Sequence, residues 1–309
     1  MTSPSNTTKN NPANKMVNIP IIERIKEGFD IWKKGWLSFI LALIILFFVL
    51  LVAIVIIVVP IALIAYLVGD YEDFEDFGND ANIELTGSME SLAEFVGLIL
   101  VMAAIFIAIG VMCGLGKELI EVEDTKAENT LHYLKKYGIQ FAAIGFIIGL
   151  AVAGPLFLID LLLDDLIEQE VNDVSVLSVL VGIVAFFLIA PFTLAIPAAL
   201  IDDTGPIESV KTSVNLFRND PKTILLLFGA FIGLVLAFLS PVALLDVMLD
   251  NDSITVFEAI LAVFAALGIL VIIFVLPYVM CITFTKLYYD YRFPEKKEVS
   301  EEEAPVSLL

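Results

Sequence analysis

Six long apolar stretches without a charged residue dominate the chain, and polar segments separate them. They are residues 35–69, 95–116, 137–159, 174–201, 223–245 and 259–285. A helix that rises about 1.5 Å per residue needs about 20 residues to cross the hydrocarbon core of a bilayer. The first stretch exceeds one crossing, so we expect part of it to tilt or to project from the membrane. The pattern predicts an all-α membrane protein with six transmembrane helices.

A short amphipathic segment, residues 206–218, lies between the fourth and fifth stretches. Its apolar residues recur at helical spacing and form one stripe. They are Ile207, Val210, Val214 and Phe217. Pro206 suits the first turn of a helix, and Glu208 complements the positive N-terminal end of the helix dipole. We expect this helix to lie along the membrane interface, with its stripe toward the bilayer and Lys211 and Arg218 toward anionic headgroups.

The segment before the first stretch matches this helix at a constant offset. Charges coincide in the pairs Glu23 and Glu208, Lys26 and Lys211, and Lys33 and Arg218, and the stripe Ile22, Ile25, Phe29 and Trp32 falls on the stripe of the later helix. A weaker copy precedes the third stretch, where residues 134–136 echo residues 32–34. The pattern predicts three repeats of an amphipathic helix plus a helical hairpin. The alternative is chance similarity between apolar sequences, against which the register of the charges argues.

Proline and glycine recur at matching depths of the stretches. The first, third and fifth carry Pro60, Pro155 and Pro241, and the second, fourth and sixth carry Gly110, Pro191 and Pro277, with Pro197 following in the fourth. Proline removes a backbone hydrogen bond from a helix, and a membrane helix tolerates this only where neighbouring groups satisfy the freed carbonyl. We therefore expect softened helices at Gly110, Pro191, Pro197 and Pro277.

Basic residues set the orientation that we expect. All 17 Lys and Arg residues lie in the N-terminal region, in the second and fourth polar segments between stretches, or in the tail. By the positive-inside rule both termini are cytoplasmic, in a protein of the plasma membrane. The chain then divides into a disordered cytoplasmic arm at 1–17, a six-span membrane domain at 18–293 and an acidic cytoplasmic tail at 294–309. Met16 offers an alternative start within the arm.

The first, third and fifth polar segments between stretches are acidic and face outward in this orientation. They contain Asp70, Glu72, Asp73, Glu75, Asp76, Asp80, Glu84 and Glu90, then Asp160, Asp164, Asp165, Glu168, Glu170 and Asp173, then Asp246, Asp250, Asp252 and Glu258. An EF-hand alignment that starts at Asp73 fails, because Phe77 occupies a position that needs an oxygen ligand. We favour a well-solvated outer surface over cation binding.

Several kinds of chemistry are missing. No Asp, Glu, Lys, Arg or His lies in the middle of any stretch, which argues against ion-coupled transport. Cys113, Cys281 and the single histidine, His132, lack metal-ligand spacing, and no hydrolase or nucleotide-binding motif is present. The net charge of -20 excludes an electrostatic nucleic-acid binder. We expect no catalytic residue, no metal site, no cofactor and no nucleic-acid partner.

The densest group of polar residues lies on the expected cytoplasmic side, at the inner ends of the fourth and sixth stretches and on the amphipathic helix. The candidate residues are Asp202, Asp203, Glu208, Lys211, Arg218, Asp290 and Arg292. Carboxylates beside Lys and Arg suit a site for lipid headgroups, but the same residues also serve as helix caps and interfacial anchors. We favour the second interpretation.

Two short motifs carry a family resemblance. Residues 197–209 (PAALIDDTGPIES), with Ser213 and Phe217 downstream, and residues 287–292 (LYYDYR) are similar to the integral membrane domain attached to some glycerophosphodiester phosphodiesterases and to its stand-alone prokaryotic relatives of unknown function. The resemblance extends over about residues 17–293 and implies a six-span helical module. It implies no phosphodiesterase activity, because this sequence holds no hydrolase domain, and Tyr291 replaces the usual Leu of the closing motif.

Three functions remain open at this point. The leading hypothesis is a non-enzymatic scaffold or accessory module that contacts membrane lipids or an unidentified protein partner at its cytoplasmic face. The second is a transporter or permease-like protein for a neutral or lipidic substrate, because helices broken by Gly or Pro often flank substrate paths. The third is a membrane enzyme that acts on lipid headgroups at the carboxylates of the candidate group.

Overall fold

A computed structural model describes residues 19–68, 87–167, 174–248 and 256–294. Of these residues 91% are helical, and they contain no strand. The arm predicted at 1–17, nearly all of the tail predicted at 294–309, and the acidic residues within 69–86, 168–173 and 249–255 lie outside the described residues.

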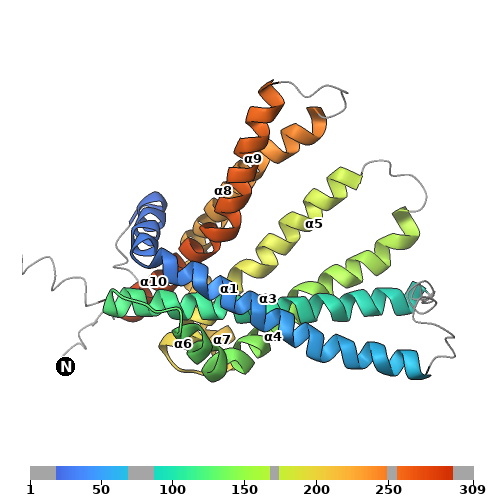
Figure 1. Cartoon of the computed structure of the whole chain (residues 1–309), viewed down its shortest axis with the longest axis horizontal. Coiled ribbons are helices and arrows are strands. Elements are labelled where there is room, and N and C mark those ends of the chain that lie inside the picture. The colour runs from blue at the N-terminus through green and yellow to red at the C-terminus, as the bar shows by residue number, and fades with distance from the viewer. Residues whose placement is uncertain (1–18, 69–86, 168–173, 249–255, 295–309) are drawn as a thin grey trace, which may run out of the picture. The chain divides into compact units, whose positions relative to one another are not determined.

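Nine α-helices and one 3-10 helix account for the regular structure of the described ranges (Figure 1). In chain order they are α1 (Ile21–Val68), α3 (Gly87–Val122), α4 (Asn129–Ile167), α5 (Val174–Ile189), η2 (Ala190–Phe192), α6 (Ala195–Ile201), α7 (Pro206–Asn219), α8 (Pro221–Met248), α9 (Val256–Phe274) and α10 (Leu276–Arg292).

Six helical stretches among the described residues are long and apolar enough to cross a membrane. They are Ile21–Val49, Phe95–Val122, Asn129–Pro155, Gly182–Ile201, Pro221–Leu245 and Ile260–Arg292. Many of their large apolar side chains are exposed, as lipid-facing side chains are. The chain is therefore a multi-pass, all-helical membrane protein, as the apolar pattern predicts.

The amphipathic segments join their spans differently. The first and second run without interruption into the long helices α1 and α4, whereas the third, α7, is a separate helix that ends at Asn219. Pro221 explains the break, because it lacks an N–H and disfavours a helical conformation at Asp220. The Asp220 carboxylate then accepts a hydrogen bond from the Thr223 N–H at 3.1 Å and caps the start of α8. In the first copy Trp36 takes the place of Pro221, and the helix continues.

The fourth and sixth stretches are each interrupted near a proline. The helix of the fourth stretch stops at Ile189, passes through η2, which contains Pro191, and resumes as α6. In the sixth stretch Val275 separates α9 from α10, and Pro277 lies in the first turn of α10. At Gly110, in contrast, helix α3 is continuous, and a Cβ there would lie 2.2 Å from the Phe141 ring. Gly110 thus lets an aromatic ring of α4 pack directly on the backbone of α3.

The chain divides into two compact units. Unit 1 comprises Met1–Lys34, Gly116–Glu123 and Ala190–Leu309, and unit 2 comprises Gly35–Leu115 and Asp124–Ile189. In unit 2, α4 packs closely on α3 at Gly145, which has no side chain. A Cβ at this position would lie 2.8 Å from the Ala103 Cα. Small residues at helix contacts are the usual means of bringing two membrane helices together.

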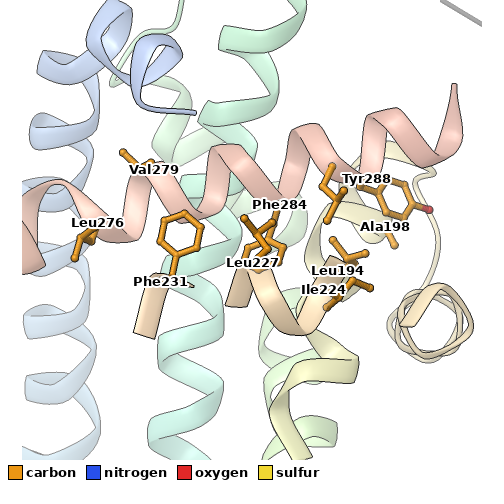
Figure 2. Close-up of a cluster of buried hydrophobic side chains, with 10 residues drawn as sticks. Leu194, Ala198, Ile224, Leu227, Phe231, Leu276, Val279, Phe284 and Tyr288 are labelled. Carbon is orange, nitrogen blue, oxygen red and sulfur yellow. The ribbon is translucent and has the colours of Figure 1, made fainter. Parts of the chain in front are cut away.

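Unit 1 has its hydrophobic core where α10 crosses α8 and α6. One face of α10 lies along the first turns of α8 and the short helix α6 (Figure 2). The buried cluster consists of Leu194, Ala198, Ile224, Leu227, Phe231, Leu276, Val279, Phe284, Leu287 and Tyr288. The start of α1 also packs on this cluster, through Ile21, Ile25 and Trp32. The two interruptions therefore position α6 and α10 as the centre of unit 1, while α8 and α9 extend side by side from it (Figure 1).

Candidate functional site

Asp202 ends helix α6 and receives two hydrogen bonds from α10. Its carboxylate accepts the Tyr288 hydroxyl at 2.7 Å and the Arg292 Nε at 2.9 Å. Tyr288 is only 2% exposed, so its hydroxyl depends on Asp202 for a partner. Arg292 is more than half exposed, so the ion pair that it forms with Asp202 contributes little to the free energy of unfolding.

Asp290, also on α10, pairs with the start of α1. The Arg24 Nη1 lies 2.8 Å from the Asp290 carboxylate, and the two side chains are 9% and 20% exposed. Lys286 and Glu27 form a second ion pair between the same two helices. Removing one partner of a buried pair leaves an uncompensated buried charge, which costs stability. Asp290 therefore stabilises Arg24 in its buried position.

Two further contacts bind the end of α10 to its neighbours. The Tyr291 hydroxyl donates to the Asp220 carboxylate at 3.2 Å, and Asp220 is the residue that separates α7 from α8. The Tyr289 hydroxyl donates to Glu121, near the end of α3. We call this network the polar clamp. Its members are Arg24, Asp202, Asp220, Tyr288, Asp290, Tyr291 and Arg292.

Helix α7 fully buries a serine face, whereas its apolar stripe is partly buried, with Phe217 packed on the hydrophobic cluster of unit 1. Ser209 and Ser213, one turn apart, are fully buried. The Ser213 hydroxyl donates to the Pro191 carbonyl at 2.7 Å and accepts from the Leu194 N–H at 3.1 Å. These two backbone groups belong to the interruption of the fourth stretch, so Ser213 satisfies groups that the broken helix leaves unpaired.

The opposite side of α7 is open. Ile207 is 63% exposed, and Glu208, Lys211 and Arg218 are exposed as well. Neither Lys211 nor Arg218 forms a hydrogen bond or an ion pair with the part of the chain that the structure describes. The rotation of α7, fixed by its buried serines, thus leaves two cations and an isoleucine uncovered.

The structure separates the predicted candidate residues into three groups. Asp202, Asp290 and Arg292 come together in the polar clamp. Glu208, Lys211 and Arg218 lie on the open side of α7. Asp203 is exposed just after α6, with a φ of 51° in the left-handed region, where Asp is among the better tolerated residues. Of the softening positions, Pro191 and Pro277 lie at the interruptions, Pro197 is buried in the first turn of α6, and Gly110 is a packing contact.

Sequence reasoning missed several members of this arrangement. Arg24, Asp220 and Ser213 were not among the candidates, although each has a partner far away in the chain. The repeat gave a signal for two of them, Arg24 and Ser213. When the first and third amphipathic segments are superposed, Arg24 matches Ser209 and Ser213 matches Gly28.

The residues of this site can hold helix ends together and can present a cationic surface. Within the described ranges no group of three or more His, Cys, Asp or Glu residues is arranged to hold a metal ion. The carboxylates of Asp202, Asp220 and Asp290 each accept a hydrogen bond from a side chain on another helix of unit 1. No protein-family model, no curated protein and no solved structure matches this chain.

Proposed function

We propose that the chain is a non-enzymatic scaffold or accessory module of the plasma membrane. Its cytoplasmic face, formed by the ends of α6 and α10 together with α7 and the start of α1, would contact membrane lipids or an unidentified protein partner. The proposal includes three repeats of an amphipathic helix plus a helical hairpin, with both termini cytoplasmic.

The observation that carries the proposal is the use of the carboxylates in the polar clamp. A lipid-headgroup enzyme would need a carboxylate available to a substrate, a water molecule or a metal ion. Asp202 is instead occupied by Tyr288 and Arg292, and Asp290 by Arg24. Contacts of this kind fix helix ends, which is the requirement of a scaffold.

Ion pairs between the two ends of the helical region support the topology. Arg24 and Glu27 at the start of α1 pair with Asp290 and Lys286 near the end of α10. Helix ends in direct contact belong on one side of a membrane, in agreement with an even number of spans. The distribution of Lys and Arg supports the cytoplasm as that side.

The burial of two amphipathic segments supports the repeats. From Ile21 to Lys34 and from Pro206 to Asn219 the degree of burial agrees at every matched position except Phe29 and Val214. Each segment also packs on the inner end of an interrupted stretch: the start of α1 on α10, and α7 on η2 and α6. In unit 2 the start of α4 packs in a related way on α3, where a Cβ on Gly114 would lie 2.6 Å from the Tyr133 ring.

The resemblance to the membrane domain of some glycerophosphodiester phosphodiesterases remains part of the proposal. The two motifs that carry it, residues 197–209 and 287–292, meet in the polar clamp through the contacts of Asp202 with Tyr288 and Arg292. This supports a structural reason for the motifs and no phosphodiesterase activity.

One observation favours the second candidate, a transporter or permease-like protein for a neutral or lipidic substrate. The interruptions before α6 and α10 place non-helical backbone within two of the apolar stretches, as in many transporters. Ser213 satisfies backbone groups of the first interruption from within the chain, which favours a fixed structural break.

Native mass spectrometry of the protein, purified from native membranes in a mild detergent, tests the proposal. We expect a protein partner or a phospholipid retained in stoichiometric amount. A bare monomer contradicts the scaffold hypothesis, and a retained neutral small molecule favours the transporter. The control variant is Asn215→Ala, which changes an exposed side chain of α7 and leaves the charges intact. It should retain the same partner or lipid as the wild type.

A further inference from the structure

The open side of α7 is a strip that combines apolar and basic residues at helical spacing. Ile207 precedes Lys211 by one turn, and Val214 precedes Arg218 by one turn. Ile207 is 63% exposed, Val214 is half-buried, and both cations are exposed. We call these four residues the α7 strip.

Chain connectivity keeps the α7 strip at the membrane boundary. Helix α6 ends at Ile201 and α7 begins at Pro206, so four residues join them, and Asp220 alone joins α7 to α8. Four extended residues span at most about 14 Å. Since α7 lies between the ends of two membrane-spanning stretches, neither of its ends can move far from the interface.

The rotation of α7 is fixed by the buried Ser209 and Ser213, so the strip cannot turn inward. At an interface the two kinds of residue in the strip have different preferences. Ile207 is stabilised among acyl chains, while long Lys and Arg side chains extend toward the headgroup phosphates. Glu208, exposed in the first turn, lies farther around the helix from Ile207 than either cation does.

We propose that the α7 strip binds the phosphate of an anionic phospholipid in the adjacent leaflet. The occupant is a lipid because the strip offers positive charge that has no partner among the described residues, next to an uncovered apolar side chain, at the level of the headgroups. The inference deepens the proposed function and rests on it for the side of the membrane that α7 occupies.

A lipid titration tests the inference on the full chain. The protein is purified in a neutral detergent, and phosphatidylglycerol or phosphatidylcholine with identical acyl chains is added in steps and followed by native mass spectrometry. We expect tighter binding of phosphatidylglycerol. Each cation near an anionic headgroup contributes about fivefold, so the double substitution K211Q and R218Q should weaken phosphatidylglycerol binding about 25-fold. It should weaken phosphatidylcholine binding by much less, because the choline ammonium neutralises the phosphate of that lipid.

The matched control removes two charges that already have partners. Lys33 pairs with Asp30 at 3.2 Å and Lys34 with Glu123 at 3.3 Å, so the substitutions K33Q and K34Q change the net charge equally. We expect them to weaken phosphatidylglycerol binding by less than about threefold. A third variant, Ile207→Ser, should weaken both lipids by the same factor, because it removes an apolar anchor and no charge.

Equal binding of the two lipids by the wild type overturns the inference, and so does an equal loss in the K33Q and K34Q control. These outcomes are distinct from a failure of the proposed function. If the protein does not prefer phosphatidylglycerol but retains a protein partner from native membranes, the scaffold hypothesis stands and the lipid site does not. If the strip binds phosphatidylglycerol but the protein transports a solute, the lipid site stands and the scaffold does not.

Discussion

The contact between Asp202 and Tyr288 offers the sharpest test of the polar clamp. The substitution Asp202→Ala removes the acceptor of a hydroxyl whose residue is 2% exposed, and it also removes the ion pair to Arg292. An unpaired buried hydroxyl costs about 1–3 kcal/mol. The ion pair adds at most about 0.5 kcal/mol, because Arg292 is more than half exposed. We expect the free energy of unfolding to fall by about 1–3.5 kcal/mol.

A double-mutant cycle isolates the hydrogen bond from the other effects. In a Tyr288→Phe background there is no hydroxyl that could lose its acceptor. Asp202→Ala should therefore lower the free energy of unfolding by only about 0.5–1 kcal/mol in that background. The difference, about 1–3 kcal/mol, is the coupling energy of the pair and corresponds to the cost of the unpaired hydroxyl. Asp202→Asn keeps an acceptor oxygen and should cost less than about 1 kcal/mol, and Arg292→Gln should cost at most about 0.5 kcal/mol.

The assay is equilibrium unfolding of the purified protein by denaturant in mild detergent, followed by far-ultraviolet circular dichroism, with the same slope required for all variants. Equal costs of Asp202→Ala in the wild-type and Tyr288→Phe backgrounds would refute the reasoning, because the hydroxyl would then not depend on Asp202.

Three further substitutions have outcomes that follow from the contacts, all measured by the same unfolding assay. Gly28→Ala places a Cβ 2.2 Å from the Thr283 Oγ1 and should destabilise the protein by about 1–3 kcal/mol; adding Thr283→Ala should recover more than half of the loss, and no recovery would show that the clash lies elsewhere. Ser213→Ala strands two buried backbone groups and should cost about 2 kcal/mol, whereas the exposed control Ser240→Ala should cost less than about 0.5 kcal/mol; equal costs would contradict the role of Ser213. Glu123→Gly relieves a φ of 61° after α3 but also removes the exposed ion pair with Lys34, which contributes at most about 0.5 kcal/mol, so the protein should be stabilised by about 0.5 kcal/mol; a destabilisation of more than about 0.5 kcal/mol would argue against that backbone conformation.

Much of the helical organisation was predictable because it follows from local chemistry. The segment predicted at 206–218 forms α7, since Pro206 starts the helix and Pro221 prevents its continuation. The six spans followed from length and apolar composition alone, because a membrane forces backbone groups to pair within the helix.

The join between amphipathic segment and span was harder to predict. The same apolar and charged pattern precedes Trp36 and Pro221, but only the proline interrupts the helix. Proline alone is also an incomplete guide, since Pro155 and Pro241 lie inside continuous helices. Whether a proline breaks a membrane helix depends on groups that satisfy the freed backbone, such as the Ser213 hydroxyl, and these lie far away in the sequence.

The buried side of α7 could not be predicted from apolar periodicity. In water an apolar stripe turns inward, but next to a bilayer the lipid accommodates it, and small residues take over the helix contacts. Ser209 and Ser213 are therefore buried while Ile207 is exposed. The ion pair between Arg24 and Asp290 joins residues at opposite ends of the helical region, and no local pattern links them.

The proposal that the chain is a scaffold is tested most directly by flux in proteoliposomes. Wild-type protein and the Asp202→Ala variant are reconstituted at equal density, and the release of neutral solutes and the scrambling of labelled phospholipids are followed against empty vesicles. A scaffold predicts rates equal to those of empty vesicles for the wild type. A protein-dependent rate that Asp202→Ala alters would contradict the scaffold and establish a transport path controlled by the polar clamp.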